Sequence, residues 1–148
     1  MARNGGNTFR LARLLELREQ QVALCRDRVE QCRAELQRWE SHRSEVVARR
    51  EGAGLAPGGG VSAAGADLRL REQGRRWFQQ ELARVAAETE QWRRALESAQ
   101  ADLWQAEQRR QRIDHLRERF ESEQQREAKR LRRRRLNRWG QSTTGGRP

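Results

Sequence analysis

Apolar side chains recur at alternating intervals of four and three residues along residues 11–46, LARLLELREQQVALCRDRVEQCRAELQRWESHRSEV. Nine of the eleven positions in this series are apolar, and the residues between them are mostly Arg, Glu and Gln. The series consists of Leu11, Leu15, Arg18, Val22, Cys25, Val29, Cys32, Leu36, Trp39, Arg43 and Val46. Sustained apolar heptads with charged residues on either side are typical of a coiled coil.

A second series with the same spacing follows later in the chain and is apolar at ten of its thirteen positions. It consists of Phe78, Leu82, Val85, Thr89, Trp92, Leu96, Ala99, Leu103, Ala106, Arg110, Ile113, Arg117 and Phe120. Between the two series, residues 52–67 contain six glycines and Pro57, which are residue types that stop helices. The sequence therefore predicts two helices, at 9–51 and 68–139.

Three residues mark the expected helix ends. Gly52 stands where a helix commonly ends in the left-handed conformation, and Asp67 is expected to cap the second helix. Gly74 costs about 1 kcal/mol in a helix interior, so the second helix is expected to become regular only near Arg75.

Two helices that each carry a narrow apolar stripe predict an all-α fold, an antiparallel coiled-coil hairpin whose second helix is longer than its first. Dimerisation through either helix is the alternative way to cover the stripes. If Glu51 lies opposite Leu68, Phe9 lies near residue 110, and the rest of the second helix has no partner. The expected organisation is a flexible N-terminus at 1–8, a first helix at 9–51, a glycine-rich linker at 52–67, a paired second helix at 68–110, a basic helical overhang at 111–139 and a flexible tail at 140–148.

The composition agrees with a thin helical rod. Of the 148 residues, 34% are hydrophobic and 36% are charged, whereas a compact domain carries about 45–50% apolar and about 25% charged residues. The composition therefore argues against a thick globular core and leaves a disordered chain or a long helix or coiled coil, of which the heptad spacing favours the coiled coil. Nothing approaches 18 apolar residues in a row and the N-terminus carries no secretory signal, so we expect a cytoplasmic protein without membrane insertion.

The net charge of +11 is concentrated at one end. Residues 8–51 carry ten Arg against eight acids, residues 68–108 carry seven of each, and residues 109–139 carry thirteen Arg or Lys against five acids. Such an asymmetry indicates a directed electrostatic contact. Nucleic acid, an anionic membrane and an acidic protein surface are the three classes of partner that attract a segment of this kind.

No residues suggest catalysis or a cofactor. Cys25 and Cys32 lie roughly 10.5 Å apart along one helix, too far for a disulfide or a shared zinc ion. His42 and His115 are single, and Gly60 stands where a phosphate-binding loop needs its lysine. We therefore expect a non-enzymatic protein with no catalytic residues, no cofactor and no metal.

The five tryptophans fall into two groups. Trp39 and Trp92 occupy heptad core positions. Trp77, Trp104 and Trp139 lie outside the seam, which is the line of heptad positions along which the two helices are expected to pair. Because exposed tryptophan is enriched where proteins meet, the second group is a set of contact candidates.

The chain resembles the FliJ family of flagellar type III export proteins over residues 9–139. A Phe-x-Leu followed by a Leu-Leu-x-Leu-Arg-Glu run opens the first helix, a glycine-containing break follows near residue 55, and the segment RRQRIDHLRERF (109–120) precedes a charged end. The residues of the first run are Phe9, Leu11, Leu14, Leu15, Leu17, Arg18 and Glu19. Where members often end with mixed charge, this chain ends in Arg132–Arg135.

The resemblance implies a stalk similar to that of rotary ATPases, at the cytoplasmic side of the inner membrane at the flagellar base. Its free end, with both chain termini, would insert into the hexameric export ATPase, and other surfaces would contact the membrane-embedded export gate and substrate chaperones. Residues 9–18 and 109–139 would face the ATPase, and Trp77 would face the gate. The expected contact residues are Phe9, Leu14, Arg18, Trp77, Trp104, Arg126, Lys129, Arg130, Arg132, Arg133, Arg134, Arg135, Arg138 and Trp139.

Three other interpretations stay open at this point. Stalk proteins of the injectisome type III secretion system share the same shape. A basic coiled coil that binds RNA or DNA through residues 126–138 belongs to a different functional class, and a purely structural dimer is the third.

Overall fold

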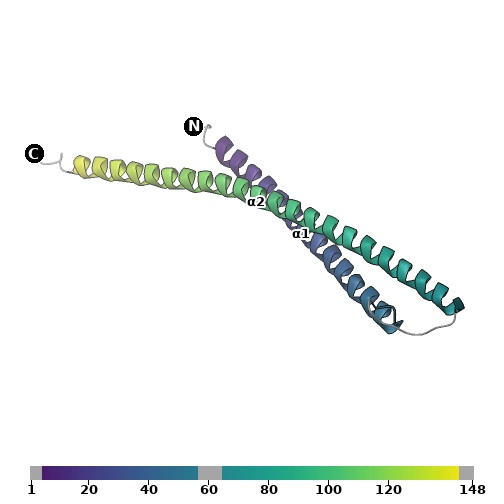
Figure 1. Cartoon of the computed structure of the whole chain (residues 1–148). Coiled ribbons are helices and arrows are strands. Elements are labelled where there is room, and N and C mark those ends of the chain that lie inside the picture. The colour runs from purple at the N-terminus through teal and green to yellow at the C-terminus, as the bar shows by residue number, and fades with distance from the viewer. Residues whose placement is uncertain (1–4, 57–64, 144–148) are drawn as a thin grey trace, which may run out of the picture. The chain divides into compact units, whose positions relative to one another are not determined.

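The structure, a computed structural model, describes residues 5–56 and 65–143. Its two elements are α1 (Gly5–Gly52) and α2 (Gly65–Thr143), and this described part of the chain contains no strand (Figure 1). The predicted all-α class, with two helices of which the second is longer, is therefore confirmed.

The helices extend further than the sequence predicted. The helix α1 includes residues 5–8 of the expected flexible N-terminus, and α2 continues through 140–143 of the expected tail. The remaining residues of those two segments lie outside the described chain, as do residues 57–64 of the expected linker.

The end of α1 is closed by a backbone cap whose left-handed residue lies two positions after the expected Gly52. The amide of Gly54 donates to the carbonyl of Glu51 (3.0 Å), and the amide of Leu55 donates to the carbonyl of Arg50 (3.1 Å). This pair of hydrogen bonds is a Schellman motif, which needs a left-handed residue. Gly54 supplies it with a φ of 67°, so the expectation that Gly52 ends the helix in this way is wrong.

The first turns of α2 run without interruption through Gly74, so the expected late start near Arg75 is wrong. A Cβ atom at Gly74 would lie 2.9 Å from Cδ1 of Leu55, so the residue three positions beyond α1 packs directly on this glycine. Since α2 begins at Gly65, Asp67 lies inside its first turn and the expectation that it caps the helix is wrong; its negative charge is stabilised there by the positive end of the helix dipole. Because Leu55 lies against Gly74 in an antiparallel pair, the assumed alignment of Glu51 with Leu68 is wrong.

The structure divides into two units, and the first comprises Ala23–Trp104. Here α1 and α2 lie antiparallel, since Val29 and Cys32 pack with Ala99 while the loop-side residue Leu55 packs on Gly74. Partly buried side chains of α2 complete this core: Trp92, Ala95, Leu96 and Leu103. The predicted hairpin pairing is present within this unit.

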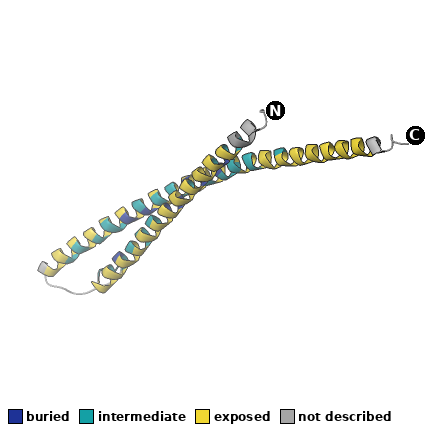
Figure 2. Cartoon of the chain, turned by 180° about the vertical axis from the view of Figure 1, so that it is seen from behind, coloured by how far each residue is buried: buried dark blue, intermediate teal, exposed yellow. Residues whose placement is uncertain are grey.

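The second unit combines the beginning of α1, up to Val22, with α2 from Gln105 onwards. Leu15, Val22 and Ala106 are buried in it. Partial burial in α2 continues to Phe120, and residues 121–140 are all exposed (Figure 2). By burial, the part of α2 without cover therefore begins after Phe120, later than the expected overhang at 111.

The heptad series identifies the covered stripe of both helices. Every one of its positions is buried or partly buried except Arg43 and Arg117, whose charged side chains are exposed. Thr89 is the one polar residue of the series that is buried, and its hydroxyl donates to the carbonyl of Val85 (2.7 Å). That hydrogen bond removes the cost of burying an unpaired hydroxyl.

Candidate functional site

The end of α2 carries an exposed concentration of positive charge. Residues 126–138, called the basic segment below, contain eight basic residues and one acidic residue, and all their side chains are exposed. Glu127 is the last acidic residue of the chain. Just before the segment, Arg117 pairs with Asp114 (3.1 Å) and Glu121 (3.7 Å), whereas no ion pair in the described chain involves the basic segment.

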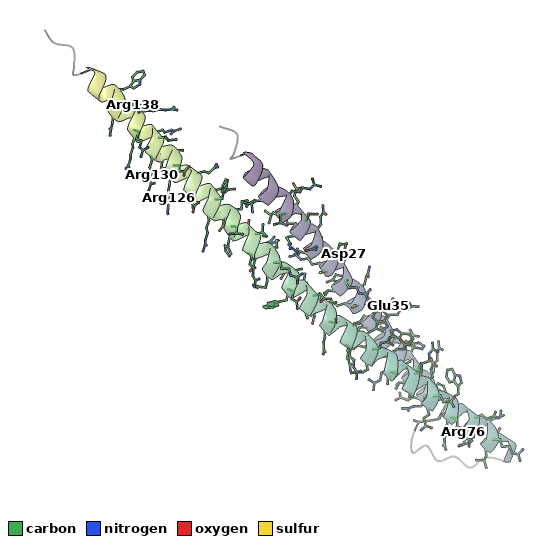
Figure 3. The ribbon with its side chains drawn as sticks, turned by 90° about the horizontal axis from the view of Figure 1, so that it is seen from above. Asp27, Glu35, Arg76, Arg126, Arg130 and Arg138 are labelled. Carbon is green, nitrogen blue, oxygen red and sulfur yellow. The ribbon has the colours of Figure 1, made fainter. Side chains whose placement is uncertain are left out.

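The basic positions of the segment are distributed around the whole helix axis, and Figure 3 shows side chains on both sides of the ribbon in this part of α2. At about 100° per residue, no gap between neighbouring basic positions around the helix axis is wider than about 60°. These positions are Arg126, Lys129, Arg130, Arg132, Arg133, Arg134, Arg135 and Arg138. A flat partner would contact only some of them, so the arrangement favours a partner that surrounds the helix.

Large apolar side chains are few in this part of α2. Leu131, Leu136 and the adjoining Trp139 are exposed, and Trp139 is the most exposed large hydrophobic residue of the described chain at 78%. On the helix circumference Arg132 and Arg135 lie between these three residues, so no continuous apolar face forms. The segment is therefore a cationic helix with isolated apolar contacts.

The expected contact residues of α1 belong to the same unit as the basic segment. Leu14 and Arg18 are partly buried, and Nη1 of Arg18 donates to Oε1 of Gln21 (2.8 Å). Nε of Arg18 is buried without a hydrogen-bond partner among the described residues. Phe9 lies in α1, but its side chain falls outside the part that the structure describes.

The two remaining expected contact residues lie in the other unit. Trp77 and Trp104 have exposed fractions of 51% and 63%. The Trp77 ring packs edge-on against Phe78, with centroids 4.9 Å apart and an interplanar angle of 81°. This contact holds the ring in place while leaving half of it accessible. The structure thus distributes the expected contact residues over two units and does not gather them into one site.

A cluster across the helices of the first unit was missed by the sequence analysis. Nε2 of His42 lies 3.1 Å from Oε1 of Glu81. The Trp39 ring contacts His42 edge-on (5.8 Å, 75°), and the guanidinium of Arg84 lies 5.9 Å from the Trp39 ring centroid. His42 lies beside the heptad series, and positions flanking a coiled-coil seam commonly pair across it. The position of His42 beside the heptad series was therefore the sequence feature that could have predicted a contact across the helices.

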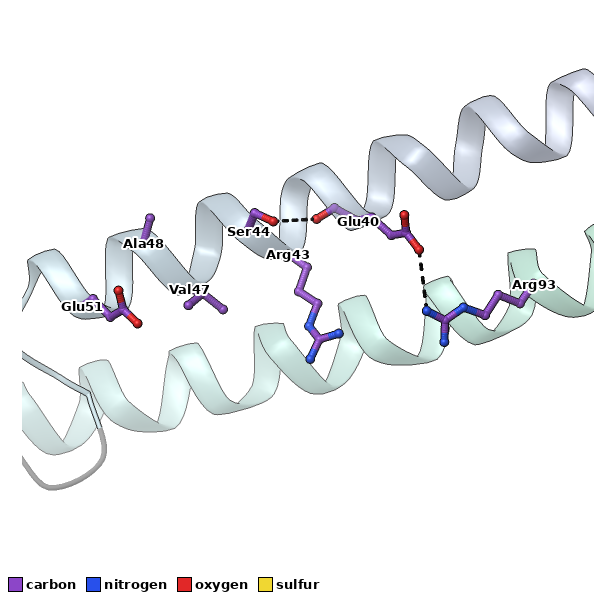
Figure 4. Close-up of a pocket in the computed structure, with 7 residues that line it drawn as sticks. All are labelled: Glu40, Arg43, Ser44, Val47, Ala48, Glu51 and Arg93. Atoms are coloured by element: carbon purple, nitrogen blue, oxygen red, sulfur yellow. Dashed lines mark hydrogen bonds and ion pairs between the residues drawn. The ribbon is translucent and has the colours of Figure 1, made fainter.

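A groove between the helices of the first unit has a volume of about 460 Å³ (Figure 4). At one end an ion pair joins Arg93 to Glu40 (3.6 Å), and the hydroxyl of Ser44 donates to the carbonyl of Glu40 (3.2 Å). The lining residues are Glu40, Arg43, Ser44, Val47, Ala48, Glu51 and Arg93. They include no nucleophile beside a general base. Among the residues that the structure covers, no three His, Cys, Asp or Glu side chains gather as metal ligands.

Cys25 and Cys32 are free thiols, the first partly buried and the second fully buried in the seam. They pack as small apolar residues, as their heptad positions predicted. Within the described ranges, neither helix is long and apolar enough to cross a membrane.

Comparison with known proteins identifies one family. The family model described as Flagellar FliJ protein matches residues 7–136, which is nearly the whole chain. No curated protein and no solved structure matches the chain significantly. The match confirms the resemblance found in the sequence.

Proposed function

Because this chain belongs to the FliJ family of flagellar export proteins, we propose that it is the stalk that binds the hexameric export ATPase through its basic free end. Family membership makes it a stalk-like component of flagellar type III protein export, in a family of non-enzymatic export proteins. The flagellar family model also favours the flagellum over the injectisome as its system.

The charge distribution of the basic segment is the observation that carries the proposal. A ring of subunits surrounds whatever enters its channel, and a helix with charge on every side can contact such a wall throughout its circumference. Opposite charge on the wall would speed association and fix the orientation more than it would raise affinity. The exposure of residues 121–140 leaves the helix accessible from all sides.

The beginning of α1 supplies a second, weaker part of the same surface. Leu14 and Arg18 are partly buried in the unit that contains the basic segment. Their role in the proposed contact is to hold the two helices together where the stalk enters the ring. Phe9 is assigned to the ring contact from the family resemblance alone.

Contacts with the export gate and with export chaperones are proposed for the exposed tryptophans. Trp77 and Trp104 present large, half-exposed aromatic surfaces, and tryptophan is among the residues that contribute most to protein–protein binding. We assign Trp77 to the gate. These contacts would hold the protein at the cytoplasmic face of the inner membrane, at the base of the flagellum.

The test is the effect of the purified chain on the turnover and ring assembly of its export ATPase. We expect the wild-type chain to increase both, and the triple variant Arg130→Gln, Arg133→Gln, Arg134→Gln to lose most of the effect.

The matched control is the triple variant Arg28→Gln, Arg69→Gln, Arg75→Gln, which removes the same charge from exposed positions elsewhere. It should behave as the wild type. The proposal is wrong if the wild-type chain leaves the ATPase unchanged, or if both triple variants lose the effect equally.

A further inference from the structure

We propose that the basic segment also binds duplex DNA without sequence preference, with the helix in the major groove and its arginines on the phosphates of both walls. This activity goes beyond the stalk function and does not depend on it. The occupant is inferred from three features of the segment: where its charge lies, how wide the bare helix is, and where its acidic residues stop.

The distribution of charge around the helix does not match a flat anionic surface. A membrane-bound helix needs an apolar face turned to the lipid and its basic residues on the other face. Here Arg132 and Arg135 lie between the exposed apolar residues Leu131, Leu136 and Trp139. Basic residues on all sides match instead a groove whose two walls are both lined with phosphate.

The dimensions of the segment match the major groove of B-form DNA. An α-helix with its side chains is about 10–12 Å wide, and the major groove is about 12 Å wide and admits one helix. The thirteen residues of the segment span about 20 Å. Basic regions that continue from coiled coils lie in this groove in other DNA-binding proteins. The major groove of A-form RNA is too narrow for a helix of this kind.

The acidic residues fix where contact begins. Glu121, Glu123 and Glu127 precede or open the segment and would repel phosphate, whereas no acid follows Glu127. Seven basic residues of the segment lie beyond it. Because each phosphate contact contributes about −0.9 to the slope of log K against log salt, contacts from six or seven of these residues predict a slope between about −5.4 and −6.3.

The experiment measures fluorescence anisotropy of labelled 20-base-pair duplexes with the full chain over a range of salt concentrations. We expect binding with that slope, equal for two unrelated sequences, and weaker binding to an RNA duplex of the same sequence.

Two triple variants test whether the partner surrounds the helix. Arg130→Gln, Arg133→Gln, Arg134→Gln removes charge from one side, and Arg132→Gln, Arg135→Gln, Arg138→Gln removes the same charge from the other. A groove predicts that both lose about tenfold or more in affinity and that both slopes become shallower by about 2.7. Circular dichroism should show that both variants keep their helix content.

Four results would overturn the proposal. The first is that one of the two triple variants binds DNA as tightly as the wild type, which would indicate a flat partner. The second is that the control Arg28→Gln, Arg69→Gln, Arg75→Gln loses as much affinity, which would indicate an effect of net charge alone. The third is that the RNA duplex binds as tightly as the DNA duplex, and the fourth is that vesicles rich in phosphatidylglycerol bind the chain while DNA does not. Since the ATPase assay is separate, failure here leaves the stalk proposal standing, and the reverse also holds.

Discussion

The seam around Ala99 and the basic segment are both parts of α2, yet they differ in what covers them. Around Ala99 the heptad positions are apolar and pack on Val29 and Cys32 of α1. Beyond Phe120 the heptad positions are mostly polar, and residues 121–140 are all exposed. These later positions are Gln124, Glu127, Leu131, Arg134 and Arg138. The same helix thus packs on its own chain where its stripe is apolar, and is exposed over residues 121–140, where the stripe is mostly polar or charged.

The largest effect is expected from a charge in the seam. Val85 is completely buried, and Val85→Asp should destabilise the fold by about 3–5 kcal/mol, because an ionised carboxylate there has no partner. Urea denaturation followed by circular dichroism measures this. Leu24→Asp, at an exposed position of α1, should change stability by no more than about 0.5 kcal/mol. Equal losses from the two variants would show that the seam does not hold the helices together.

A smaller loss is expected from the cluster between the helices. His42→Ala removes the contact with Glu81 and the edge contact with Trp39, and should cost about 1–2 kcal/mol in the same denaturation experiment. The comparison variant is His115→Ala, because His115 is exposed and, among the described residues, pairs with Glu118 of its own helix. A stability change no greater than that of His115→Ala would show that the cluster contributes nothing to helix pairing.

The packing of Leu55 on Gly74 predicts a coupled pair of effects. Alanine at position 74 favours the helix by about 1 kcal/mol, but its Cβ would lie 2.9 Å from Cδ1 of Leu55 and force that side chain to move. Gly74→Ala should therefore stabilise the wild type by less than it stabilises the Leu55→Ala variant. Thermal unfolding of the four proteins in this double-mutant cycle gives the difference. Identical gains in both backgrounds would mean that the two residues do not touch in solution.

The smallest change in stability is expected from the basic segment. Because its side chains are exposed and pair with nothing in the described chain, Arg130→Gln, Arg133→Gln, Arg134→Gln should alter the unfolding free energy by no more than about 0.5 kcal/mol. A clear destabilisation in urea would place these arginines in the fold, and their loss of binding could no longer be assigned to a partner surface.

The covered stripe was predictable because burial in a two-helix fold follows a single periodicity. Positions such as Val29, Cys32 and Val85 were identified by spacing alone, and the structure buries all three. The polar Thr89 was identified in the same way, although its hydrogen bond to the backbone could not be seen in the spacing. At Thr89 the heptad position thus predicts burial where residue type does not, whereas the charged Arg43 and Arg117 are exposed at heptad positions.

The features that could not be predicted from the sequence depend on how the two helices align along each other and on how α1 is capped. The contact of Gly74 with Leu55 and the pairing of His42 with Glu81 both depend on which residues of the two antiparallel segments lie opposite each other. Several glycines follow α1, and which of them takes the left-handed position depends on where the last carbonyls are capped, as at Gly54. Periodicity specifies a face of each helix but not the alignment of one face along the other.

The bareness of the basic segment also makes it the most vulnerable part of the described chain. Trypsin cuts after arginine and lysine, and a helix without tertiary packing opens locally at little free-energy cost. Brief digestion should remove this end first and leave the seam around Ala99 intact, so a trimmed preparation would keep its helices while losing its charge. Protection of these bonds in the presence of a ligand would then report occupancy directly, arginine by arginine, for any partner that encloses the helix.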